Sequence, residues 1–123
     1  MNLERYSPDA RQVLQYAEEE ARAFRHGQIG THHFLIALIR AGAFPGDERE
    51  ARLYVREATF ELEPRLDQLP ERLPFSYGSK QLLARAEQYA GAGPVTTAHL
   101  AESIKHQSGH VVSVLHRMGI FLA

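Results

Sequence analysis

The sequence of 123 residues contains no cysteine and no tryptophan, and no apolar run in it is long enough to cross a bilayer. Without cysteine the chain has neither disulfides nor thiolate chemistry, which is typical of a protein in a reducing cytosol. The first five residues do not form the basic stretch, followed by an apolar one, that marks a secretory signal. We therefore expect a soluble, cytoplasmic protein.

The sequence also has no large excess of charge of either sign. The formal net charge is −1, and lysine and arginine are interleaved with glutamate along the chain. Binding to a phosphate backbone needs a basic stripe, so nucleic acid is not an expected partner. The sequence has no Gly-x-x-x-x-Gly-Lys-Ser/Thr loop and no Gly-x-Ser-x-Gly turn, the signatures of an ATPase and of a serine hydrolase. We expect no enzymatic activity and no cofactor.

What the sequence does contain is an internal repeat. Residues 6–21 return as residues 75–90, with an aromatic residue, serine, a basic residue, glutamine, an aliphatic pair and Ala-Glu in register. A small-residue turn and a Thr-x-His element follow each copy, over residues 29–35 and 95–101. A duplicated helical unit buries its core between neighbouring helices, which favours a binding module over an enzyme. We expect one domain over residues 1–123, with repeat one at 1–69 and repeat two at 75–123.

Apolar residues at spacings of three and four predict an all-α fold, a pseudo-twofold tandem repeat of a four-helix unit. A chain of this length can bury roughly two-thirds of its unfolded surface without metals or disulfides. The segment 34–40 is so apolar that its helix should be the central one. About seven helices are expected, beginning near Ser7, Thr31, Asp47, Glu63, Ser76, Thr97 and Gly109. The second repeat would then be truncated by one helix.

The Thr-x-His elements suggest helix starts. Thr31 and Thr97 are expected to be N-caps, a role that alone explains them. His33 and His99 fall in the first helical turn, where the dipole disfavours the imidazolium, so each is expected to be neutral and hydrogen-bonded. His32 is expected to be exposed.

The aromatic residues before the two repeated helices have two interpretations. Tyr6 and Phe75 are expected to plug the ends of their own repeats. In the alternative, Phe75 and Lys80 line a groove between the repeats, where an apolar residue of a partner could dock.

Seven histidines also raise the question of a metal site. His106 and His110 are four residues apart, but Gly109 and the expected turn separate them, and no His-Glu-x-x-His motif occurs. Zinc binding is a weaker alternative, and Ser108-Gly109-His110 is most simply a polar turn.

The pattern aromatic-Ser-x-x-x-basic, then Ile-Gly-Thr-x-His before an apolar helix, then Gly-x-Val-x-x-Val-Leu-x-x-Met-Gly-Ile, resembles the Clp N-terminal repeat. That repeat occurs in pairs at the head of the Clp/Hsp100 AAA+ unfoldases, and the similarity is greatest to the ClpC branch. It covers almost the whole chain, most strongly residues 6–40 and 75–120. The resemblance implies a non-catalytic domain that binds protein or peptide substrates, or adaptor proteins, for a Clp ring in regulated proteolysis or chaperone function.

The sequence departs from the ClpC pattern at two equivalent positions. There the second helix of each repeat usually begins Gly-Thr-Glu-His, and the glutamate resembles a carboxylate that binds phosphoarginine. His32 and Ala98 stand at these positions, and a bidentate carboxylate is replaced only partly by an imidazole and not at all by a methyl group. Phosphoarginine recognition is therefore not expected, although the free N–H groups after Thr31 and Thr97 could still bind an anion. The candidate ligand- or peptide-binding residues are Ser7, Thr31, His32, Ser76, Thr97, Ala98, Phe75 and Lys80.

Three alternatives follow. The chain could be a diverged small-ligand-binding or sequestering domain, or a metal carrier. A homodimer could form through the truncated second repeat, since an uncovered apolar helix surface tends to find a partner. The apolar tail over residues 120–122 is consistent with that.

Overall fold

The computed structural model describes residues 2–121. In them the chain forms a short 3₁₀ helix and six α-helices: η1 (Leu3–Arg5), α1 (Pro8–Phe24), α2 (Thr31–Arg40), α3 (Glu48–Thr59), α4 (Tyr77–Ala90), α5 (Thr97–Ile104) and α6 (His110–Arg117). The prediction of an all-helical fold is confirmed. None of the helices described is both long and apolar enough to span a bilayer.

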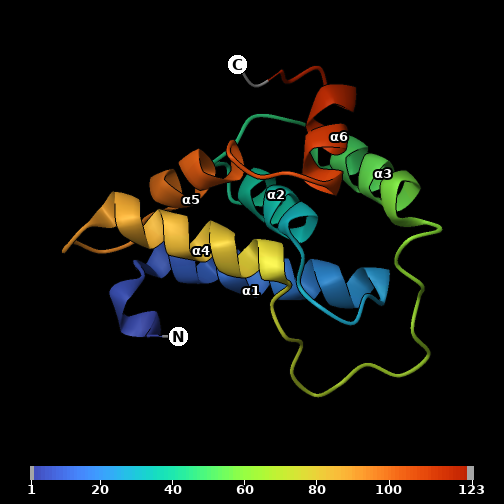
Figure 1. Cartoon of the computed structure of the whole chain (residues 1–123), viewed down its shortest axis with the longest axis horizontal. Coiled ribbons are helices and arrows are strands. Elements are labelled where there is room, and N and C mark those ends of the chain that lie inside the picture. Colours follow the sequence, from blue (N-terminus) through green and yellow to red (C-terminus); the bar gives the residue numbers. More distant parts are fainter. Residues whose placement is uncertain (1, 122–123) are drawn as a thin grey trace.

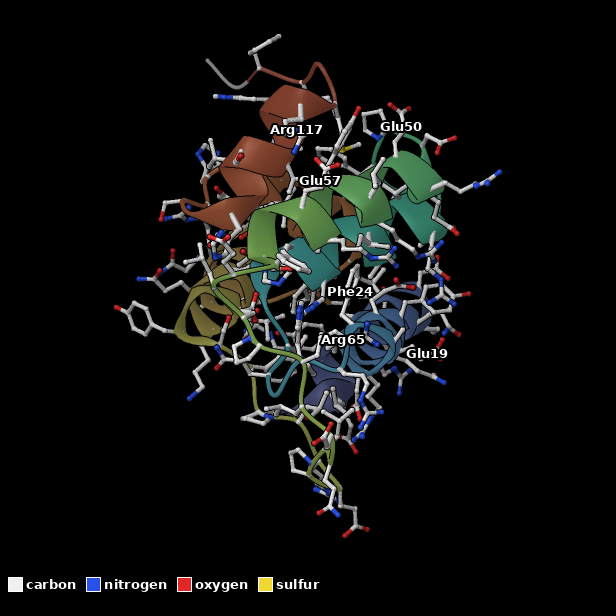
Figure 2. All side chains as sticks on the ribbon, turned by 90° about the vertical axis from the view of Figure 1, so that its right-hand side faces the viewer. Glu19, Phe24, Glu50, Glu57, Arg65 and Arg117 are labelled. Carbon is white, nitrogen blue, oxygen red and sulfur yellow. The ribbon has the colours of Figure 1, made fainter. Side chains whose placement is uncertain are left out.

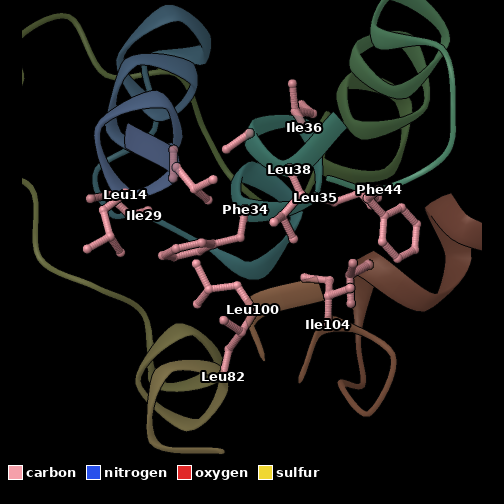
Figure 3. Close-up of a cluster of buried hydrophobic side chains, with 14 of the residues drawn as sticks. Leu14, Ile29, Phe34, Leu35, Ile36, Leu38, Phe44, Leu82, Leu100 and Ile104 are labelled. Atoms are coloured by element: carbon pink, nitrogen blue, oxygen red, sulfur yellow. The ribbon is translucent and has the colours of Figure 1, made fainter. Parts of the chain in front are cut away.

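Helix α2 is the centre of the core, with the other helices arranged around it (Figure 1). Every residue from Thr31 to Ile39 is buried, as the apolar composition of this segment predicts. The side chain of Phe34 extends from α2 toward Leu100 of α5 (Figure 3). One helix therefore supplies the apolar surface on which both halves of the chain pack.

The starts of α1 and α4 are capped as the sequence predicts. The Ser7 hydroxyl accepts a hydrogen bond from the N–H of Ala10 at 3.2 Å. Ser76 accepts one from Ser79 at 3.1 Å. These serines hold equivalent places in the repeat, so the sequence similarity corresponds to the same local structure.

The starts of α2 and α5 differ from the prediction by one residue. Their N-caps are Gly30 and Thr96, and the threonines at 31 and 97 are the first helical residues. His33 Nδ1 accepts a hydrogen bond from the Gly30 N–H at 2.8 Å, and His99 Nδ1 accepts one from the Thr96 N–H at 3.0 Å. The predicted hydrogen bonding of both histidines is confirmed, and it is the histidine that satisfies the backbone at the cap.

Reciprocal backbone hydrogen bonds join the two halves. Val95, just before α5, is bonded to residues 5–7, with both N···O distances 2.8 Å. Ile29, just before α2, is bonded in the same way to residues 74–76, at 2.8 and 2.9 Å. The first helix of each half therefore begins beside the second helix of the other half.

This exchange corrects the prediction for the two aromatic residues, because each packs on the opposite repeat. Tyr6 is buried and donates a hydrogen bond to Glu87 Oε2 of α4 at 2.8 Å. The ring of Phe75 lies 6.1 Å from the ring of Phe34 in α2. A nonlocal backbone pairing thus decides which core each ring enters.

The helix expected near Glu63 does not form. Residues 60–76 form an irregular segment, which lies below the helices in Figure 1. Arg25 Nε donates to the Leu66 carbonyl at 2.6 Å, and Arg22 Nη2 donates to the Glu71 carbonyl at 2.5 Å. Because these carbonyls bond to the end of α1, they are not free to form helical hydrogen bonds.

Each half therefore contains three α-helices in the part of the chain that the structure describes, six rather than seven in all. The second repeat lacks no helix that the first one has, so the reason given for a homodimer disappears. Of the apolar tail, Ile120 is partly buried and Phe121 is exposed, and Leu122 lies outside the described residues.

A buried carboxylate ties three helices together. Glu20 of α1 is only 4% exposed. It accepts two hydrogen bonds from Arg52 of α3, at 2.8 and 2.9 Å, and one from Arg40 of α2 at 2.8 Å. Burial alone would raise the pKa of Glu20, but the two guanidinium groups lower it below its usual value.

We expect Glu20→Gln to lower the free energy of unfolding by about 2 kcal/mol at pH 7, because hydrogen bonds to the carboxylate are lost in a buried site. The pKa of Glu20 is lower in the folded state than in the unfolded state, where it is about 4.3. The stabilisation by the Glu20 carboxylate is therefore complete above about pH 4.3 and is lost as the pH falls through the folded-state pKa. Urea unfolding across this pH range measures it. Glu57→Gln is the control, because the Glu57–Arg117 pair is exposed and should contribute less than about 1 kcal/mol.

Candidate functional site

The two predicted anion sites are not equivalent in the structure. At the start of α2, Gly30, Thr31 and His32 are all buried. The methyl group of Thr31 lies against Gly78, 3.2 Å from where a Cβ on that glycine would be, and Ser76 is next to it. Thr31 and Ser76 thus lie near one another, but this helix start is closed to solvent.

The start of α5 is open by comparison. Thr97 is half-buried and Ala98 is exposed. The pairing of Val95 with residues 5–7 places Ser7 at the same end. Of the predicted residues, Ser7, Thr97 and Ala98 therefore form the accessible group.

His32 is buried rather than exposed, which contradicts the prediction. Its side chain is only 6% accessible, and its ring folds over Gly30, where a Cβ would meet it at 2.5 Å. Its Nε2 lies 2.9 Å from Oε2 of Glu63, and neither atom has another hydrogen-bond partner among the residues that the structure describes. The glycine at the helix start leaves the space that this ring fills.

His32 belongs to a group of three adjacent buried histidines with His26 and His33. His26 Nδ1 lies 2.9 Å from His33 Nε2, and the rings of His32 and His33 are 4.2 Å apart. Because His33 Nδ1 accepts the Gly30 N–H, the His33 proton is placed on Nε2, from which it is donated to His26. Burial lowers the pKa of His26 below its usual value and that of His33 further, so both are neutral at pH 7.

Glu63 closes this cluster from the irregular segment. Its Oε1 lies 3.9 Å from His26 Nδ1. Burial would raise the pKa of the Glu63 carboxyl, but the nearby imidazoles, His32 above all, lower it below its usual value. The segment is held here by the hydrogen bond from the Leu66 N–H to the Arg25 carbonyl, 2.9 Å, and by Leu66 packing closely on Gly27.

A small pocket of about 150 Å³ connects the cluster to solvent. His26 and Glu63 form part of its wall, with Phe24 and Phe60 as apolar sides and Arg65 at the rim. Figure 2 shows Phe24 and Arg65 on this side of the molecule, near the end of α1.

A larger open groove, about 690 Å³, lies between α1 and the end of the irregular segment. Its lining is largely apolar, with an arginine on each side: Leu3, Arg11, Leu14, Gln15, Glu18, Ile29, Arg72, Leu73 and Phe75. Phe75 therefore lines a groove, but this groove lies between α1 and the segment that joins the repeats, and not between the repeats as the alternative interpretation expected. Lys80 is exposed on α4 and is not part of the lining.

The histidine pair considered for zinc in the sequence does not come together. His106 is exposed and its ring lies 6.5 Å from that of Tyr89. His110 instead points toward the buried cluster, with its ring 5.8 Å from the ring of His32. The histidines that the structure does bring together are His26, His32 and His33, whose ring nitrogens lie close enough, within 4.8 Å of one another, to share an ion.

Sequence reasoning missed His26, Glu63 and the groove residues Leu3, Leu14 and Leu73. His26 lies in the turn before α2 and could have been noticed from its spacing to the two adjacent histidines. Glu63 carries no local signal, because a single carboxylate in an irregular segment is positioned only by tertiary contacts.

The fold and the paired helix starts define an all-helical domain of two interlocked repeats. The sequence model of the Clp repeat (R) N-terminal domain matches residues 5–118, and the chain therefore belongs to this family.

Relatives of known structure have the same fold. The N-terminal domain of the chaperone ClpD from Arabidopsis thaliana superimposes with a TM-score of 0.85 and 21% identity, covering 99% of this chain and 90% of that one. The Hsp104 N-terminal domain from Candida albicans gives 0.71 and 18%, covering 95% and 83%. The chaperone ClpB of Oceanobacillus iheyensis is 43% identical over 37 residues, which are 30% of this chain and 5% of that protein.

The difference between the two helix starts predicts opposite effects of adding a carboxylate. Ala98→Glu places it at the exposed start of α5, where the helix dipole should raise the free energy of unfolding by roughly 0.3–1 kcal/mol. His32→Glu buries it beside Glu63 and should lower that free energy by about 3 kcal/mol at pH 7. The loss should shrink at pH 5, because two adjacent carboxylates can share a proton. Urea unfolding at both pH values would reveal equal effects if the sites were equivalent.

Proposed function

We propose that this chain is a non-catalytic domain that binds extended segments of substrate or adaptor proteins in the groove between α1 and residues 72–75, on behalf of a Clp unfoldase. The observation that carries the proposal is the groove itself. It is open and mostly apolar, and it is formed by the N-terminal half together with residues 72–75. An exposed apolar concavity of this kind is typical of a binding site.

The charges at the rim indicate the type of segment. Arg11 and Arg72 are exposed on opposite sides of the groove. Among the lining residues that the structure describes, Glu18 is the only carboxylate, and it is paired with Arg22 at 2.9 Å. The rim is therefore basic, which favours a peptide with apolar residues at its centre and acidic residues beside them.

The same lining supports a binding role without catalysis. Among the lining residues that the structure describes, none is a serine, threonine, lysine or histidine, so no nucleophile is paired with a base there.

Binding of a small anion by a diverged helix start remains the alternative. It draws support at α5 alone, where Thr97 and Ala98 are accessible, since the start of α2 is closed.

The groove predicts a specific loss of peptide binding. Leu3 is 49% exposed at one wall, so Leu3→Asp should leave the core intact but place a charge in the apolar centre. Fluorescence anisotropy with short labelled peptides, Leu/Phe-rich with Asp/Glu flanks, should show affinity about tenfold lower than that of the unmodified domain. Arg72→Glu should weaken binding of the peptide with acidic flanks and strengthen binding of one with lysine flanks.

Leu53→Asp is the matched control, because Leu53 is also 49% exposed but lies on α3, outside the groove. Its affinity should equal that of the unmodified domain. Equal losses from Leu3→Asp and Leu53→Asp, or no preference between acidic and basic flanks, would contradict the proposal.

A further inference from the structure

The buried histidines have a role that helix capping does not explain. In the second half His99 caps α5 as His33 caps α2, with its Nδ1 on the Thr96 N–H. Yet Ala98 stands where the first half has His32, and no other histidine joins that cap. Capping therefore accounts for His33 but not for His26 and His32, which stand beside it only in the first half.

Two buried atoms of the cluster have no partner besides each other. His32 Nε2 and Glu63 Oε2 lie 2.9 Å apart, and no other group in residues 2–121 hydrogen-bonds to either of them. Buried polar atoms usually have their hydrogen-bonding capacity filled, because burial removes their hydration. A cation bound between this imidazole nitrogen and this carboxylate oxygen would interact with the lone pairs of both.

We propose that His26, His32, His33 and Glu63 form a binding site for a divalent transition metal ion, with zinc as the best match. Three imidazole nitrogens and one carboxylate oxygen are a donor set typical of zinc in four-coordinate sites. The separations are 2.9 Å for His26–His33, 2.9 Å for His32–Glu63 and 3.9 Å for His26–Glu63, and the three imidazole ligand atoms lie within 4.8 Å of one another. In a tetrahedral site with ligands about 2.1 Å from zinc, neighbouring ligand atoms are about 3.4 Å apart, so rotation of these side chains about their bonds would be needed to form it.

Metal coordination by His33 would disturb the N-cap of α2. His33 Nε2 can bind a metal only if its proton moves to Nδ1, which accepts the Gly30 N–H in the metal-free protein. Two N–H groups would then face one another in a buried site, which would reduce affinity by roughly five- to 150-fold. The affinity that a complete four-ligand site gains from zinc is larger than this loss by many orders of magnitude.

The cluster is accessible, and its ligands come from separate parts of the chain. The pocket beside His26 and Glu63 provides a path from solvent. Arg56 and Arg65 also line it and would oppose a cation, but both are exposed, so water and salt screen them. The ion would join the turn before α2 and the start of α2 to the irregular segment that follows α3.

Zinc titration of the full chain tests the proposal. The protein should carry no affinity tag, and metal should be removed by chelation and dialysis before calorimetry with zinc chloride. We expect one ion per chain with a dissociation constant below about 1 μM. Cobalt in place of zinc should give the visible absorption bands of a tetrahedral complex.

Two substitutions and one control locate the ion. His32→Gln and Glu63→Gln should each weaken zinc binding by more than roughly a hundredfold, since loss of a ligand exceeds loss of its supporting partner. Glu63→Gln lies outside the helices, so it should remain folded even where His32→Gln does not. The exposed His106→Gln should bind zinc like the unmodified chain.

Zinc should also raise the melting temperature of the unmodified chain but not of Glu63→Gln. The absence of stoichiometric zinc binding, or binding that persists unchanged in Glu63→Gln, would overturn the proposal. Binding lost in His106→Gln would place the ion on the surface and would overturn it too.

Discussion

The reciprocal backbone pairing between the halves is the constraint on which the other features depend. Val95 fixes the start of α1 against the start of α5, and Ile29 fixes the start of α4 against that of α2. Neither half can place its own helix starts alone, because each uses hydrogen bonds from the other. This exchange puts the aromatic residues before α1 and α4 into opposite cores and leaves Phe75 at the edge of the groove.

Within that shared frame the two halves have diverged at equivalent positions. Both retain a histidine that caps the second helix, because the N–H of Gly30 or Thr96 needs an acceptor there. One residue earlier, His32 fills the space over a glycine and turns inward, whereas Ala98 leaves the helix start exposed. A single position thus separates a closed polar cluster from an open helix end.

The sequence predicts what is local and misses what is nonlocal. Helix caps at Ser7 and Ser76, and the burial of α2, follow from residue type and spacing, so they could be predicted. The absence of a fourth helix after Glu63 could not be predicted from the sequence. It results from nonlocal hydrogen bonds, because Arg22 and Arg25 at the end of α1 bind carbonyls of this segment. The packing of Tyr6 depends on its pairing with Val95, 89 positions away in the chain, which no periodicity reveals.

The irregular segment links the two proposed sites. Its first part carries Glu63 to the histidine cluster, and its last part, with Arg72 and Leu73, forms one wall of the groove. Between them, Arg22 and Arg25 hold the backbone to α1. An ion bound at Glu63 would restrict the motion of this segment. The segment would then lose less conformational entropy when a peptide binds the groove. Because such coupling is reciprocal, peptide in the groove would in turn favour the ion.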